Sequence, residues 1–118
     1  MTQITPQPQG VWAWIWQRIT AVLLVLFLGA HLLVLHYIPE NMNINFLGVA
    51  ARFKSVLYLV IDSGLLAVAL YHGLNGVRNV LFDFVSNEGK RRALTWLLWL
   101  VGLAYLIWGA YALTFFVK

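Results

Sequence analysis

The residues best suited to chemistry lie in one apolar stretch in the middle of the chain. They are His72, Asn75, Gly76, Asn79 and Asp83. At about 100° per residue these positions share one stripe of a helix, whereas Arg78 lies about 120° from His72. A neutral imidazole at membrane depth can ligate haem iron axially, and a glycine one turn away leaves room for a flat macrocycle. The stripe therefore indicates a candidate haem-facing surface. The alternative is that His72 hydrogen-bonds to a neighbouring helix.

A second set of polar residues lies in the first apolar stretch. His31 follows Arg18 by about 20 Å of helix, which places it at a depth comparable to that of His72. It has no acidic residue in its own stretch, so its partner is a second haem, a haem propionate or another helix. His36 is interpreted as a wet interfacial histidine. Arg18 either pairs with a haem propionate through its planar guanidinium or extends to the lipid headgroups.

Asp62 has the weakest functional case. It stands near the basic residues Arg52 and Lys54, so a structural ion pair or a capping role is favoured over proton transport. The chain has no cysteine and shows no nucleophile–base arrangement, phosphate loop or carboxylate pair, which excludes hydrolysis or group transfer by the chain alone. Any catalytic role must come through a bound redox cofactor or a partner.

Composition identifies the elements that carry these residues. The chain has 118 residues, of which 62% are hydrophobic and 10% charged, against about 25% charged in a soluble domain. Apolar stretches at about 12–37, 55–82 and 94–117 each exceed the roughly 20 residues that a helix needs to cross a bilayer. We therefore predict one all-α membrane domain over 1–118 with three transmembrane helices, the first a retained helix and not a cleaved signal peptide. The polar stretches are 38–54 and 83–92, the second a turn.

Basic residues predict the orientation of these helices. The side that holds the N-terminus and the second polar stretch carries Arg18, Lys90, Arg91 and Arg92. The other side carries Arg52, Lys54 and Lys118. The side with more lysine and arginine is expected to face the cytoplasm, so we predict a cytoplasmic N-terminus. The same residues explain the net charge of +4, so the charge does not indicate binding to nucleic acid. Gly102 and Gly109 predict a close contact for the third helix. The ionisable groups exceed what three helices can enclose, which predicts partner helices from another subunit.

Two segments resemble a known family. They are QRITA at 17–21 and YHGLNGVRNVLFDF at 71–84. Together with three helices in under 120 residues, they resemble the small membrane anchors of succinate dehydrogenase, respiratory complex II, and among these the D-type hydrophobic anchor. The architecture covers essentially the whole chain, whereas the specific motifs cover about 20 residues. Gln17-Arg18 stands where the C-type cytochrome subunit has His-Arg.

The resemblance implies roles for six residues. His72 matches the axial ligand of haem b, and Arg18 matches a basic residue near the haem propionates and the quinone pocket. Asp83 and Phe84 match an Asp–Tyr pair at the ubiquinone site. Phe84 lacks the hydroxyl that would donate to a quinone carbonyl. This difference is consistent with a quinone pocket lined differently from that of the ubiquinone enzymes, such as one for menaquinone. Some family members hold two haems, which makes His31 the candidate second ligand, with His36 as the alternative.

The resemblance also implies partners and a reaction. A cytochrome b-type anchor, an iron–sulfur subunit and a flavoprotein subunit would complete the complex. The complex would pass electrons from succinate to quinone in the tricarboxylic acid cycle and respiratory chain. The chain would be a non-catalytic, multi-pass subunit of a bacterial inner membrane, or of the mitochondrial inner membrane. Three alternatives stay open: an anchor of quinol:fumarate reductase, a small transporter or proton-conducting subunit that uses Asp62 and His72, and a haem-free anchor.

Overall fold

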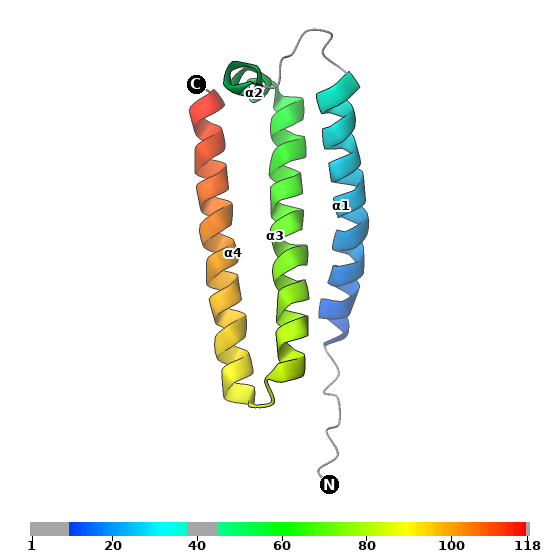
Figure 1. The fold of residues 1–118 in the computed structure, drawn as a ribbon, viewed down its shortest axis with the longest axis vertical. Coiled ribbons are helices and arrows are strands. Elements are labelled where there is room, and N and C mark those ends of the chain that lie inside the picture. Colours follow the sequence, from blue (N-terminus) through cyan, green and yellow to red (C-terminus); the bar gives the residue numbers. More distant parts are fainter. Residues whose placement is uncertain (1–9, 38–44, 118) are drawn as a thin grey trace.

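The protein is built from helices alone in the part that the structure describes. The structure is a computed structural model and describes residues 10–37 and 45–117. Its helices are α1 (Val11–Tyr37), α2 (Phe46–Arg52), α3 (Val56–Phe84) and α4 (Glu88–Val117). The three long helices lie side by side with α3 in the middle, in contact with both α1 and α4 (Figure 1). The start of α1, the end of α3 and the start of α4 share one end of the molecule.

Three helices are long and apolar enough to cross a membrane. The candidate spans are Val11–Val34, Val56–Phe84 and Glu88–Phe115. The prediction of an all-α, three-span membrane anchor is confirmed. Together with the relatives described below, these spans make the chain a multi-pass membrane protein.

Two boundaries differ from the sequence prediction because side chains cap helices inside the polar stretches. The short helix α2 lies within the predicted stretch 38–54, and the Asn45 side chain accepts a hydrogen bond from the Gly48 N–H at 2.8 Å. Helix α4 begins at Glu88, earlier than the predicted residue 94, because Asn87 Oδ1 accepts from the Lys90 N–H at 3.1 Å. Asparagine is a preferred residue at helix N-termini for this reason.

Arg91 closes the connection between α3 and α4. Its Nη2 donates to the Phe82 carbonyl at 2.8 Å, and its Nε donates to the Val85 carbonyl. The Arg91 guanidinium carbon lies 5.2 Å from the centroid of the Phe82 ring. These contacts satisfy carbonyls at the end of α3 that have no partner within the helix. The predicted turn is therefore shorter than 83–92.

Glycine sets the distance between α3 and α4. A Cβ built on Gly102 would lie 2.5 Å from Leu74 Cδ1, and one built on Gly109 would collide with the Leu66 side chain. The predicted close contact at these two glycines is confirmed, because each admits a leucine of α3.

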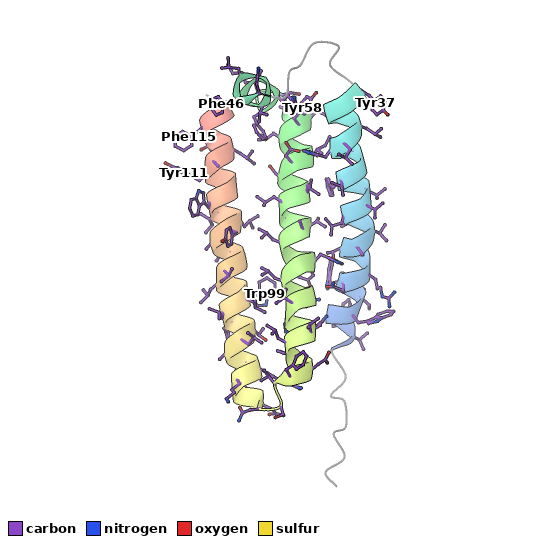
Figure 2. The ribbon with its side chains drawn as sticks, in the orientation of Figure 1. Tyr37, Phe46, Tyr58, Trp99, Tyr111 and Phe115 are labelled. Atoms are coloured by element: carbon purple, nitrogen blue, oxygen red, sulfur yellow. The ribbon has the colours of Figure 1, made fainter. Side chains whose placement is uncertain are left out.

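The described residues enclose almost no core of their own. Val34 is the one buried hydrophobic residue among them, with 8% of its surface exposed. Tyr37 of α1 and Tyr111 and Phe115 of α4 are exposed and point outward, whereas Trp99 of α4 lies on the side of α3 (Figure 2). An apolar exterior of this kind suits a lipid environment and leaves surface for partner helices.

Candidate functional site

The His72 imidazole lies between α3 and α1. Its Nδ1 is 3.2 Å from Thr20 Oγ1. The Thr20 hydroxyl, 5% exposed, donates to the Trp16 carbonyl at 2.7 Å. Because that single proton points to Trp16, the hydroxyl oxygen serves as an acceptor toward His72. We infer that Nδ1 carries the imidazole proton and that Nε2 keeps its lone pair.

An amide chain connects His72 to the rest of α3. Gln17 Nε2 donates to the His72 carbonyl at 3.3 Å and lies 3.5 Å from His72 Nε2. Gln17 Oε1 accepts from Asn75 Nδ2 at 2.6 Å. Asn75 is buried, with 9% of its surface exposed, so both ends of its amide need partners.

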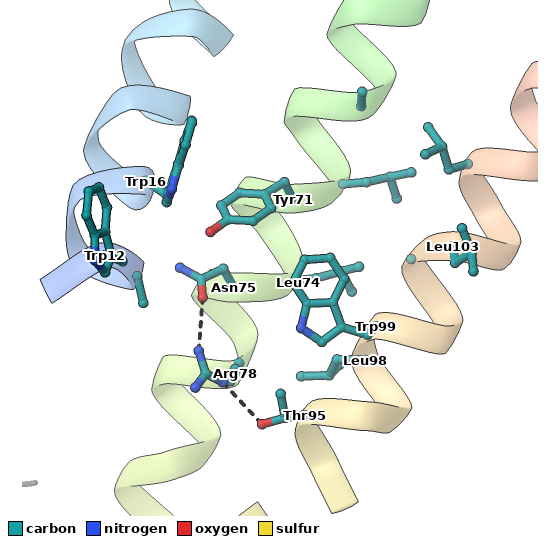
Figure 3. A pocket seen from close by; sticks show the side chains of 15 residues that line it. Trp12, Trp16, Tyr71, Leu74, Asn75, Arg78, Thr95, Leu98, Trp99 and Leu103 are labelled. Carbon is teal, nitrogen blue, oxygen red and sulfur yellow. Dashed lines mark hydrogen bonds between the residues drawn. The ribbon is translucent and has the colours of Figure 1, made fainter. Parts of the chain in front are cut away.

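The same chain continues to α4 through Arg78. Arg78 Nη1 donates to Asn75 Oδ1 at 3.4 Å, and its Nε donates to Thr95 Oγ1 at 3.2 Å (Figure 3). The Thr95 hydroxyl in turn donates to the Arg91 carbonyl at 2.8 Å. Polar groups inside a membrane are costly unless paired, and this network pairs them across all three long helices.

A hollow on α3 begins at His72. It measures about 460 Å³ and is lined by His72, Gly73, Gly76, Val77, Val80 and Leu81. A Cβ added to Gly73 would meet nothing within 4 Å. A flat macrocycle can therefore approach the helix backbone beside the imidazole, so the residues on this surface fit a haem.

His31 is paired with Asp62 across α1 and α3. The distance from His31 Nδ1 to Asp62 Oδ1 is 2.6 Å, and both side chains are half-buried. The expectation that His31 finds its acidic partner on another helix is met by Asp62. Asp62 contacts His31 and not the nearby basic residues that the sequence suggests, because Asp62 lies on the side of α3 that faces α1.

The remaining predicted site residues lie at the surface. The Arg18 guanidinium carbon is 5.1 Å from the centroid of the Trp14 ring. Asp83 is exposed, and Phe84 has 83% of its surface exposed. These residues share one end of the molecule with the network but stand outside its described hydrogen bonds. The side chain of His36 lies outside the described residues.

Comparison with known proteins places the chain in a family. Residues 2–113 match the family described as the succinate dehydrogenase/fumarate reductase transmembrane subunit. The chain belongs to this family. The resemblance to succinate dehydrogenase membrane anchors is thereby confirmed.

Three relatives of this membrane anchor are named as succinate dehydrogenase membrane subunits, one of them as SdhC, so the D-type assignment within the family stays a prediction. One is the succinate dehydrogenase 2 membrane subunit SdhC of Mycobacterium tuberculosis, 33% identical over 101 residues, which are 83% of this chain and 70% of the relative. The others are succinate dehydrogenase hydrophobic membrane anchor subunits. That of Archaeoglobus fulgidus is 29% identical over 86% of each chain. That of Halobacterium salinarum is 31% identical over 63% of this chain and 57% of the relative.

In this membrane anchor, sequence reasoning left Gln17 and Thr20 without a role toward His72. Gln17 and Thr20 are three residues apart on α1, so their side chains lie on the same face of the helix. That spacing of polar residues near the start of a membrane helix was the available signal. The described residues hold no cluster of three or more His, Asp or Glu side chains that could bind a metal ion. A single histidine suffices for axial ligation, because the haem ring supplies the other nitrogens.

Proposed function

We propose that the chain is a membrane-anchor and cytochrome b subunit of a succinate:quinone oxidoreductase. It would hold a b-type haem through His72 and contribute to a quinone site. The chain does not itself oxidise succinate. Its partners would be a second, cytochrome b-type anchor, an iron–sulfur subunit and a flavoprotein subunit.

The observation that carries this proposal is the fixed imidazole of His72. When Nδ1 donates to the Thr20 hydroxyl, the lone pair stays on Nε2, which faces the Gln17 amide nitrogen at 3.5 Å and would have to exchange that contact for iron. Ligating histidines donate their second ring N–H to a neighbouring acceptor in this way. Gly73 leaves open space beside His72 for a macrocycle, whereas a Cβ built on Gly76, the glycine expected to leave this room, would lie 3.6 Å from the Gln17 amide nitrogen. Haem supplies one-electron transfer when bound.

His31 is the proposed axial ligand in complexes that hold a second haem. Asp62 occupies Nδ1, which leaves Nε2 for iron. In a one-haem complex His31 instead stabilises the contact between α1 and α3. His36 is the alternative second ligand.

The quinone site is proposed at the end of the molecule shared by Arg18, Asp83 and Phe84. Both Asp83 and Phe84 are exposed, as residues that meet a partner subunit or a substrate must be. Phe84 offers a ring face without a hydroxyl, which favours a pocket that differs from that of the ubiquinone enzymes, such as one for menaquinone. We place this end in the cytoplasm, in a bacterial inner membrane or its mitochondrial equivalent, from the distribution of basic residues.

The test uses the complex purified from membranes after co-expression with its natural partner subunits. We expect a reduced-minus-oxidised spectrum with b-type bands, and haem quantitation should give one or two haems per complex. His72→Ala should remove one haem. His31→Ala should remove a second haem from a two-haem complex and leave a one-haem spectrum intact. A stoichiometric complex without b-type bands would overturn the haem assignment and favour a haem-free anchor.

Two further alternatives have direct tests. An anchor of quinol:fumarate reductase would give a complex that oxidises quinol faster than it oxidises succinate. A proton-conducting subunit would make vesicles that contain only this chain leaky to protons, and Asp62→Asn would abolish the leak.

A further inference from the structure

A second cavity lies on another side of α3, between α1, α3 and α4. It measures about 430 Å³, which is within the range of ligand pockets. Arg78, Asn75 and Thr95 form its polar part, and Figure 3 shows them joined by hydrogen bonds below the rings of Tyr71 and Trp99. Because Arg78 is about 120° from His72 around the helix, this cavity is separate from the hollow beside the imidazole.

The cavity is polar at one end and apolar at the other. Arg78 stands six residues, about 9 Å, before the end of α3, near the depth at which lipid headgroups lie. Trp12, Trp16 and Trp99 line the cavity at this end, as tryptophans do at membrane interfaces. Leu103 and Leu106 continue its wall toward the membrane centre. An amphiphile with its head at Arg78 and one chain along the leucines matches this gradient.

The charge of Arg78 indicates which kind of lipid headgroup this cavity would bind. Arg78 is the one charged residue among those that line the cavity, and its hydrogen bonds go to the neutral oxygens of Asn75 and Thr95. The one ion pair among the described residues joins His31 and Asp62, so Arg78 has no carboxylate partner there. A guanidinium fork matches a phosphate group and holds it through charge-assisted hydrogen bonds.

The shape of the cavity argues against a partner helix as its occupant. Close contacts between membrane helices need small residues. Of the small residues that line this cavity, Gly102 already admits Leu74, and the large rings of Trp16, Tyr71 and Trp99 line it beside Ala13 and Ala67. A quinone ring is uncharged and would leave Arg78 with only the Phe82 ring, 4.8 Å from its guanidinium carbon, facing its charge. We propose that this cavity binds one anionic phospholipid, with its phosphate on Arg78 and an acyl chain along Leu103 and Leu106.

The test counts retained lipid by native mass spectrometry. The full complex is delipidated, incubated with equal amounts of phosphatidylglycerol and phosphatidylcholine, and released from detergent. The wild type should retain one phosphatidylglycerol more than Arg78→Gln. The matched control, Arg92→Gln, removes an exposed arginine at the same end of the molecule, and it should retain as much lipid as the wild type.

A second variant keeps the proposal testable if Arg78→Gln fails to assemble. Ala67 is exposed and lines the cavity, so Ala67→Phe fills it and leaves Arg78 and its hydrogen bonds in place. We expect at least a five-fold loss of the bound phosphatidylglycerol in this variant, with the complex intact in size-exclusion chromatography. Inorganic phosphate at millimolar concentration should not displace the lipid, because it lacks the chain.

Four results would overturn the proposal. They are equal retention in Ala67→Phe and wild type, equal retention of phosphatidylcholine, displacement by inorganic phosphate, and displacement by a short-chain quinone. The last would make the cavity a quinone site. None of these results depends on haem content, so the test stands apart from that of the proposed function.

Discussion

The two histidines at membrane depth have partners of opposite chemistry. His72 Nδ1 faces a neutral hydroxyl at 3.2 Å, whereas His31 Nδ1 faces a carboxylate at 2.6 Å. Both contacts join α1 to α3. A hydrogen bond to a carboxylate is shorter and stronger than one to a neutral hydroxyl. The comparison therefore separates a weak contact between α1 and α3 at His72 from a strong one at His31.

The largest expected effect comes from removing the carboxylate. Asp62→Ala leaves His31 Nδ1 without its partner in apolar surroundings, which should lower the free energy of unfolding by about 1–3 kcal/mol. Thermal unfolding of the purified complex measures this loss. Asp62→Asn keeps an acceptor but not the charge, so we expect about half of the loss. An Asn variant as stable as the wild type would show that the carboxylate charge adds nothing to the contact, and would remove the distinction between the two histidines. Asp83→Ala, at an exposed acidic residue, is the control.

A smaller effect is expected at Gln17. Gln17→Leu removes the acceptor of the buried Asn75 amide and the donor to the His72 carbonyl. We expect a loss of about 1 kcal/mol, typical of one net hydrogen bond, together with a shift in the redox midpoint potential of the haem proposed at His72. Gln17→Glu restores the acceptor toward Asn75. If both variants titrate at the wild-type potential, the amide chain does not influence the His72 environment.

The smallest effect is expected at Thr20. Thr20→Val keeps the shape of the side chain and removes one 3.2 Å contact to His72 Nδ1, which should cost about 0.5–1 kcal/mol. The imidazole then loses a contact that orients it, so the electron paramagnetic resonance signal of the proposed haem should broaden. Thr20→Ser restores the hydroxyl and should restore the sharp signal. An unchanged signal in the Val variant would mean that another group orients His72.

The sequence predicted the three spans because each apolar stretch exceeds the length needed to cross a bilayer. It also predicted the stripe that holds His72 and Asn75, because helical periodicity is a local property. The partner of Asp62 could not be predicted. Residues near in sequence suggested basic partners, whereas the true contact, His31, is 31 residues away. The register between α1 and α3 depends on side-chain packing, which periodicity does not encode. The same limit hid the connection from Arg78 to His72 through Asn75 and Gln17.

The internal hydrogen-bond network has a consequence for how the complex is made. The polar groups of Gln17, Asn75 and Arg78 are paired within the chain itself, as are His31 and Asp62. In a newly inserted copy these groups therefore already have hydrogen-bond partners within the chain, which lowers the free-energy cost of holding them at membrane depth.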